Sequence, residues 1–250
     1  MKRIYIILIT AVVSIASGTA RANAGDATGY ATTAAKAERF FANAEWPSAC
    51  AMYILMLEER PECPTTYSAA VVANTMAGDT VQALALVPRA MSHGIAVDSL
   101  LSGVRSRSFS IGRGDIYEHF LLDIKSHYPW LARVADNCLM QYYAFRQNGP
   151  MLIRYARLML DGMPENRRFK RMLARGLMLD GRTTEAVATW TDIIGAHPDD
   201  YDTLLDLGNY YDATGDANRA VHYLTRAEDI RPTPYVARRI NDITQKSNIK

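Results

Sequence analysis

Prolines divide the chain at nearly equal intervals. They are Pro61, Pro129, Pro164, Pro198 and Pro232, and each follows a stretch rich in Leu, Ile or Met. The intervals are 68, 35, 34 and 34 residues, and the first is twice 34, with Ile95 at the position of the absent proline. A repeat of this length over most of a chain is typical of proteins that stack one small unit many times. The sequence therefore predicts about six copies of one structural unit.

Each copy predicts a pair of helices. The positions 12, eight and five residues before each proline position are apolar in all six copies. Spacings of four and three residues place these columns on one face of a helix. An earlier helix precedes it in each copy, and its clearest pattern is Leu204, Leu207, Gly208 and Tyr211. The three columns contain Ala49, Ala83, Tyr117, Leu152, Ala186 and Ala220; Tyr53, Val87, Leu121, Ala156, Trp190 and Leu224; and Met56, Ala90, Ile124, Met159, Ile193 and Ala227.

The sixth copy resembles the tetratricopeptide repeat (TPR). The residues that carry the resemblance are Leu204 to Tyr211 with the Leu207-Gly208 pair, then Gly215, Asp216, Ala220, Leu224, Ala227 and Pro232. The fifth copy keeps Leu173, Ala174, Gly181, Ala186, Trp190 and Pro198, and the first keeps Ala37, Phe40, Ala49, Tyr53 and Pro61. The resemblance implies an all-α fold, a right-handed TPR solenoid of about six helical hairpins over residues 30–233.

The third copy departs from the pattern. Arg105 occupies a position that should be small and packed, and Gly112 and Gly114 crowd the turn between the two helices. We expect this hairpin either to be distorted or to shift its register by two residues.

Helix starts and the end of the chain have their own signals. Asp79, Asp115 and Asp216 are predicted N-caps of second helices, and Asp115 has Glu118 three residues later, as in a capping box. Residues 234–250 predict a capping helix and a short tail, with an apolar stripe of Val236, Ile240 and Ile243. A terminal helix with a polar outer side shields an open stack from water.

The N-terminus predicts export. Lys2 and Arg3 precede an apolar run from Ile4 to Ala16, and Ala22-Asn23-Ala24 supplies a small-residue cleavage site. We expect a signal peptide over residues 1–24, a short linker over 25–29, and a periplasmic or secreted protein. The alternative is a retained membrane helix, but the run is shorter than the roughly 20 apolar residues that span a bilayer.

Composition and motifs argue against several functions. The formal net charge is only +2, so no nucleic-acid partner is expected. The three cysteines, Cys50, Cys63 and Cys138, are predicted to pack without bridging. The sequence contains no catalytic or metal-binding motif, so we expect no enzyme, no metal and no cofactor. A Cys–His nucleophile pair stays open, because such residues meet only in the fold.

The TPR resemblance implies a binding surface on the first helices of the hairpins, where this family commonly binds peptides. Arg168, Arg171 and Arg175 recur at spacings of three and four, so they share a helix face and could bind a carboxylate bidentately. This resembles a carboxylate clamp, although the Lys and Asn positions of such clamps are only partly filled. The alternative is that the arginines are solvated or pair with Asp202 and Asp206. The candidate binding residues are Asn137, Gln141, Phe145, Arg168, Arg171, Arg175 and Asn209.

These features together predict a scaffold or assembly factor of the cell envelope that binds a protein or peptide, with an acidic or C-terminal carboxylate segment. No stable membrane insertion is expected after cleavage. The alternative is an envelope protein that handles carbohydrate or lipid, which would need a pocket lined by aromatic residues such as Trp130, Tyr142, Tyr143 and Phe145. The third copy also offers a weaker, serine-rich inner face, formed by Ser99, Ser102, Ser106 and Ser110 with Phe109.

Overall fold

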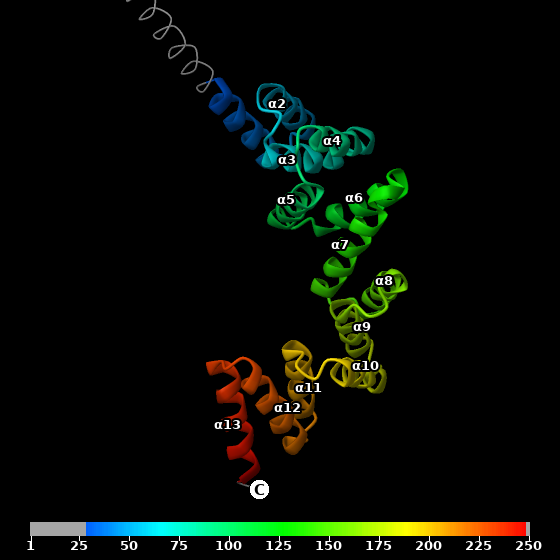
Figure 1. Ribbon diagram of the computed structural model, residues 1–250. Coiled ribbons are helices and arrows are strands. Elements are labelled where there is room, and N and C mark those ends of the chain that lie inside the picture. The colour runs from blue at the N-terminus through cyan, green and yellow to red at the C-terminus, as the bar shows by residue number, and fades with distance from the viewer. Residues whose placement is uncertain (1–28, 249–250) are drawn as a thin grey trace, which may run out of the picture. The chain divides into compact units, whose positions relative to one another are not determined.

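The computed structural model describes residues 29–248, and every regular element within them is a helix (Figure 1). The all-α prediction is confirmed. The predicted signal peptide and linker residues 25–28 lie outside the described residues. None of the described helices has the length and apolar character needed to cross a membrane.

The helices form two compact units, and the boundary between them along the chain lies between His127 and Tyr128. Unit 1 contains a helix over 29–42, α2 (Trp46–Glu59), α3 (Pro64–Met76), α4 (Thr80–Ser92), α5 (Val97–Ser110) and α6 (Gly114–His127). Unit 2 contains η1 (Pro129–Leu131), α7 (Ala132–Phe145), α8 (Gly149–Gly162), α9 (Arg167–Leu179), α10 (Thr183–Ala196), α11 (Tyr201–Ala213), α12 (Ala217–Ile230) and α13 (Pro234–Asn248). The described chain therefore has the six predicted hairpins, three in each unit, and the predicted terminal helix.

The repeat columns form the core of every hairpin. All eighteen residues of the three apolar columns are buried, from Ala49 in α2 to Ala227 in α12. Burial of large apolar side chains stabilises a fold by about 1.5–3 kcal/mol each. The 34-residue period thus marks the second helix of each hairpin, whose apolar face packs on its neighbours.

Each hairpin turns through one residue with a positive φ angle, at the same position of the repeat. Four of these residues are glycines, and the first and fourth hairpins use Ala44 and Gln147, with φ of 58° and 53°. A positive φ crowds any residue that carries a Cβ atom, which explains why glycine is preferred there. The glycines are Gly78, Gly112, Gly181 and Gly215. Gly112, which seemed to crowd the third turn in the sequence, is therefore its normal turn residue.

Side-chain caps start several helices. The Asp79 and Asp216 carboxylates accept hydrogen bonds from the backbone N–H groups of Gln82 and Arg219, as predicted, both at 3.0 Å. The prediction for Asp115 is wrong. α6 already begins at Gly114, and Asp115 lies in its first turn, where it pairs with the guanidinium of Arg113.

The third hairpin is regular in its bounds, so of the two alternatives the structure favours the shift by two residues over the distortion. Arg105 is exposed, and α5 packs more extensively against α3 than against its own partner α6. The small residue that permits this approach is Gly103, where an added Cβ atom would lie 2.1 Å from the Ser68 Oγ atom. The close contact has therefore moved two residues along α5 and faces a different helix.

Stacked tyrosines recur in unit 2. Tyr143 and Tyr155 stack with ring centroids 5.5 Å apart in the fourth hairpin, and Tyr211 and Tyr223 stack at 5.6 Å in the sixth. Each pair joins the first helix of a hairpin to the second. The two pairs are two repeat lengths apart in the sequence, so the same position of the repeat is used twice.

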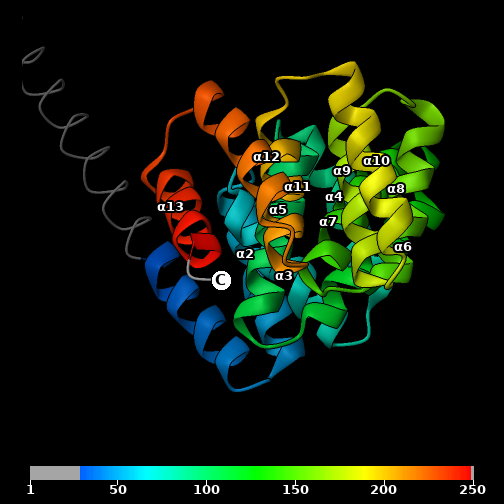
Figure 2. The ribbon, with the colours of Figure 1, turned by 90° about the horizontal axis from the view of Figure 1, so that it is seen from below.

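α13 closes unit 2 as the sequence predicts. It lies beside α12 in both ribbon views (Figures 1 and 2). Val236 and Ile243 are buried against Ala220 and Leu224 of α12, with Ile240 partly buried beside them. The apolar stripe of the last helix thus covers the apolar face that the sixth hairpin would otherwise expose.

The cysteines Cys50, Cys63 and Cys138 are half-buried, and no disulfide bond joins any two of them. Burial raises the pKa of the Cys50 thiol to about 11, so this side chain stays protonated and unreactive.

Candidate functional site

The arginine stripe of α9 lies in unit 2, and its central member is already paired. Arg171 donates from Nη1 to Asp202 Oδ2 at 2.7 Å and from Nε to Asp206 Oδ2 at 3.1 Å. This is the pairing with the next hairpin that the sequence offered as the alternative to a clamp. Burial raises the pKa of Asp206, and the nearby Arg171 only partly offsets that effect.

The other two arginines are less engaged. Arg175 is exposed and donates one hydrogen bond from Nη2 to the Ala144 carbonyl of α7, at 3.2 Å. Arg168 is exposed and forms no ion pair within residues 29–248. Arg175 thus joins α9 to α7 and Arg171 joins α9 to α11, which connects three successive first helices.

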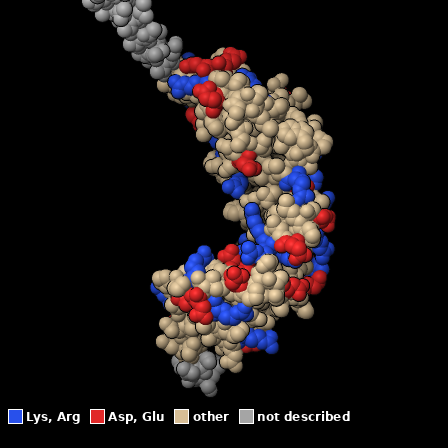
Figure 3. Space-filling model, viewed as in Figure 1, with Lys and Arg blue, Asp and Glu red and all other residues tan. Residues whose placement is uncertain are grey.

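The remaining predicted residues lie on these connected helices. Asn137 and Gln141 of α7 and Asn209 of α11 are half-buried, and the Asn137 Oδ1 atom is buried without a hydrogen-bond partner in the described chain. Phe145 is 68% exposed at the end of α7. In Figure 3, acidic and basic side chains lie side by side over the helices of unit 2. Further pairs there are Arg231 with Asp202 and Arg239 with Asp212.

The four aromatic residues considered for a carbohydrate or lipid pocket differ in how deeply they are buried. Tyr142 and Tyr143 are buried in unit 2, whereas Trp130 and Phe145 are 60% and 68% exposed. The two buried rings contact each other, and Tyr143 also stacks on Tyr155. These tyrosines therefore pack helices together, which is the ordinary role of aromatic residues at such spacings.

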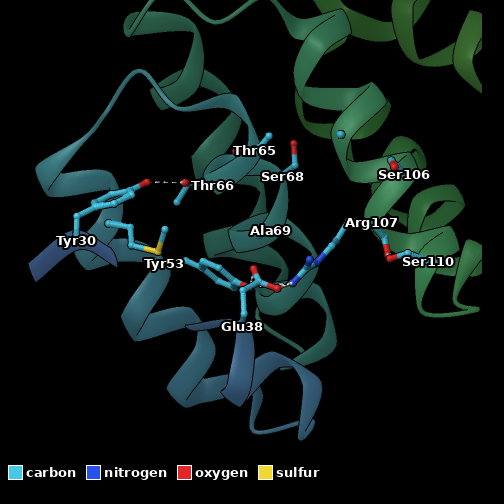
Figure 4. A pocket seen from close by; sticks show the side chains of 12 residues that line it. Tyr30, Glu38, Tyr53, Thr65, Thr66, Ser68, Ala69, Ser106, Arg107 and Ser110 are labelled. Atoms are coloured by element: carbon cyan, nitrogen blue, oxygen red, sulfur yellow. Dashed lines mark hydrogen bonds and ion pairs between the residues drawn. The ribbon is translucent and has the colours of Figure 1, made fainter. Parts of the chain in front are cut away.

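Sequence reasoning missed a pocket in unit 1. Its volume is about 380 Å³, within the size range of ligand sites. The first helices of three successive hairpins converge on it, namely the helix over 29–42, α3 and α5, and α2 forms part of the wall (Figure 4). The lining residues are Tyr30, Glu38, Tyr53, Met56, Thr65, Thr66, Ser68, Ala69, Gly103, Ser106, Arg107 and Ser110.

Arg107 is the centre of a hydrogen-bonded cluster in this pocket. Figure 4 shows Arg107, Glu38 and Tyr53 pointing toward one another. Arg107 Nη2 donates to Glu38 Oε2 at 2.6 Å and to the Tyr53 hydroxyl at 3.0 Å, and that hydroxyl donates to Glu38 Oε1 at 2.9 Å. The guanidinium also lies 3.9 Å from the ring centroid of Phe41. Its position is therefore fixed from two sides, and burial raises the pKa of Tyr53 well above its usual range.

Hydroxyl groups dominate the rest of the lining. Ser68 donates to the Pro64 and Leu100 carbonyls, and Ser110 donates to the Arg107 carbonyl, so both are engaged by the backbone. The exposed hydroxyl of Ser106 has no hydrogen bond to any described residue. The serine-rich face predicted in the third copy thus contributes Ser106 and Ser110. For the rest of the pocket, the sequence held one usable signal. Glu38 and Arg107 carry opposite charges and lie on the first helices of the first and third copies.

A thiol lies beside the pocket. Cys63 precedes α3, and its Sγ atom is 3.3 Å from the Thr65 hydroxyl. Burial by itself would raise the pKa of this thiol, but hydrogen bonds from Thr65, Thr66 and Tyr30 outweigh that effect and lower it. Within the described residues, no group of three or more His, Cys, Asp or Glu side chains could hold a metal ion.

Comparisons with known proteins give structural likenesses only. No family model and no curated protein matches the chain. A TPR repeat-containing protein from Cytophaga hutchinsonii is 12% identical, covers 78% of this chain and 77% of its own, and has a TM-score of 0.45. The Pseudomonas aeruginosa PilF protein is 12% identical, with coverages of 89% and 99% and a TM-score of 0.45. The TPR2AB domain of yeast Sti1, in a complex with pHSP90, is 14% identical, with coverages of 88% and 99% and a TM-score of 0.38. The fold assignment rests on the chain's own helices, six hairpins with the 34-residue period of a TPR-like repeat.

Proposed function

We propose that this chain is a scaffold that binds a protein or peptide on the faces formed by the first helices of its hairpins. The observation that carries the proposal is the preformed pocket of about 380 Å³ in unit 1, on which three successive first helices converge. Stacked helices hold such a surface rigidly, so a ligand loses its own freedom while the receptor loses little. Binding, and not catalysis, is the activity that this arrangement favours.

The α9 face of unit 2 supplies a second part of the surface. There the proposal is that Arg168 and Arg175 hold an acidic or C-terminal carboxylate segment, with Asn137, Gln141 and Asn209 beside them and Phe145 as an apolar contact. Support comes from the hydrogen-bond donors that these two arginines keep available, whereas Arg171 is held by Asp202 and Asp206. Arginine binds carboxylates in a planar, bidentate geometry, which suits this role.

Binding of acidic C-terminal peptides tests the α9 face. The Arg168→Ala/Arg175→Ala double variant is expected to lose at least about tenfold in affinity, because a hydrogen bond to a charged group contributes roughly 1.5–3 kcal/mol net of its exchange with water. Arg154→Ala/Arg157→Ala on the second helix α8 removes the same charge from exposed positions and is the matched control. Equal affinity of wild type and both variants would remove the carboxylate-binding role.

Photo-crosslinking tests the scaffold function as a whole. A photoreactive phenylalanine analogue is placed at Ser106 or Asn209 on first helices, and at Ser92 or Arg157 on second helices. The first-helix positions are expected to crosslink a defined partner in an extract of the native cell, and the second-helix positions are not. Crosslinking of the same partners from all four positions would contradict a dedicated first-helix surface.

We further propose that the scaffold acts in the cell envelope as a periplasmic or secreted assembly factor. The support is the N-terminal sequence, where a basic pair, an apolar run and Ala22-Asn23-Ala24 follow one another. A fusion to a phosphatase that is active only after export is expected to be active. Deletion of residues 1–24 should abolish that activity, and an active deletion variant would contradict export through this segment.

A further inference from the structure

The pocket of unit 1 is close to electrically neutral. Its two ionisable side chains of opposite charge, Glu38 and Arg107, are joined by an ion pair of 2.6 Å. Glu38 is about half exposed and Arg107 less so, and both side chains line the cavity. An acidic group of a ligand that approached Arg107 would also come close to the negative charge of Glu38. Like charges at such short range repel each other, even near a protein surface.

The pocket nevertheless has hydrogen-bond donors to spare. Arg107 uses only Nη2 for its bonds to Glu38 and Tyr53, so its Nη1 group keeps its protons for another acceptor, whereas the buried Nε atom is out of a ligand's reach. The Ser106 hydroxyl is also without a partner there. Ligand oxygen atoms that accept hydrogen bonds from these two accessible donors would therefore be favoured.

Small apolar surfaces complete the lining. Met56 and Ala69 form part of the wall, the ring of Tyr53 lies beside the Arg107–Glu38 pair, and the ring of Tyr30 lies farther from that pair, near Thr66 (Figure 4). The apolar part of this pocket is thus made of several small surfaces, which leaves room for small side chains of a ligand. Uncharged acceptors combined with small side chains are the chemistry of an extended peptide main chain.

From this combination, and resting on the proposed peptide-binding function, we propose that the unit 1 pocket binds an internal, uncharged stretch of peptide through its main-chain carbonyl groups, and that Glu38 excludes acidic segments. Arg107 is held in place as a donor by Tyr53 and Phe41, and Ser106 supplies a further hydrogen bond. The two units would thus recognise different peptide chemistry, a neutral segment in unit 1 and an acidic one in unit 2.

A displayed library of random peptides of about ten residues, flanked on both sides by neutral linkers, tests this proposal. The full mature chain is compared with four variants, one of which is the Arg168→Ala/Arg175→Ala double variant of the α9 face. Ser106→Leu fills the pocket, Ser92→Leu makes the same change at an exposed position of α4, and Glu38→Gln removes the acidic charge. Thermal unfolding of each variant establishes that it is folded.

The wild type is expected to enrich peptides that are depleted of Asp and Glu relative to the input library. Ser106→Leu should weaken their binding by about tenfold, the scale of an overpacked site, while Ser92→Leu leaves it unchanged. Glu38→Gln should abolish the depletion of acidic residues. The Ser106→Leu comparison keeps the test decisive even if Glu38→Gln does not fold.

Four results would overturn the proposal. One is enrichment of acidic peptides by the wild type. Another is peptide binding that is unchanged in Ser106→Leu and lost in Arg168→Ala/Arg175→Ala. In that case the scaffold function stands, and only the assignment of the peptide to the unit 1 pocket fails. A third is binding of neutral oligosaccharides at the pocket without any peptide. Absence of enriched peptides on every variant would remove the pocket assignment and the peptide-binding function together.

Discussion

At the scale of single residues, the turn of each hairpin shows how one backbone angle selects an amino acid. Ala44 and Gln147 hold the positive φ angle that glycine holds in the other four hairpins within residues 29–248. The left-handed conformation costs a residue with a Cβ atom about 1–2 kcal/mol. Both side chains are exposed, so nothing in the core requires them.

Replacing these two residues by glycine should therefore stabilise the protein. We expect Ala44→Gly and Gln147→Gly each to raise the free energy of unfolding by about 1 kcal/mol, less the entropy that glycine adds to the unfolded chain. Urea unfolding monitored by circular dichroism measures the change. Gly181→Ala, at the same position of the fifth hairpin, is the reverse control and should destabilise. A loss of stability in both glycine variants would show that the turns are not strained.

Asp206 provides a prediction of pH dependence. Its pKa is raised because burial disfavours the charged carboxylate more than Arg171 favours it, so the folded state takes up a proton at a higher pH than the unfolded state. The stabilising contribution of protonation is thus present at low pH and lost as the pH rises through the folded-state pKa.

The comparison of wild type with Asp206→Asn isolates this effect. As the pH falls from about 7 to about 4, the wild type should gain stability relative to the variant, because only the wild type binds the extra proton. Urea unfolding at both pH values provides the measurement. A relative loss of wild-type stability in acid would mean that the ion pair with Arg171 outweighs burial.

At the scale of helices, the close approach of α5 to α3 depends on one small residue. An added Cβ atom at Gly103 would lie 2.1 Å from Ser68 Oγ and 2.8 Å from Ser68 Cβ. Gly103→Ala should therefore destabilise the protein by about 1–3 kcal/mol, the usual cost of overpacking. Ser68→Gly removes both obstructing atoms.

A double-mutant cycle tests the contact. Gly103→Ala should cost less in a Ser68→Gly background than in the wild type, which gives a favourable coupling energy of about 1 kcal/mol. Gly195→Ala is the control, since a Cβ atom there would meet nothing within 4 Å. Additive effects of the two substitutions would show that α5 moves away from α3 at no cost.

The same helices show what a sequence can and cannot predict. The second-helix columns were predictable because their period is read along the chain, and every member proved to be buried. Arg105 signalled an anomaly in the third hairpin, but the compensating contact of Gly103 with α3 depends on a neighbouring hairpin. The link from Arg107 to Glu38 joins residues 69 positions apart, which no local pattern records. The spacing of the α9 arginines predicted that they share one helix face. Whether they bind a ligand or pair with acidic residues of α11 could be decided only from the position of α11 in the fold.

At the scale of the whole molecule, a stack of hairpins predicts that stability is local. Each hairpin is stabilised mainly by its immediate neighbours, so the loss of one contact should propagate only to adjacent helices. α13 offers the clearest test, because Val236 is buried against Ala220 and Leu224 of α12, whereas the adjacent Tyr235 is 57% exposed.

Val236→Asp places a charge in this contact, and Tyr235→Asp places the same charge in solvent. The first should destabilise unit 2 by about 3 kcal/mol or more, because an unpaired charge must be buried or the last helix must detach. Hydrogen exchange measured by mass spectrometry should then show lost protection in α11 to α13 and unchanged protection in residues 29–127. Tyr235→Asp should leave both patterns intact. If Val236→Asp lowers protection equally in both units, the chain unfolds as one cooperative body, and the local account of its stability is wrong.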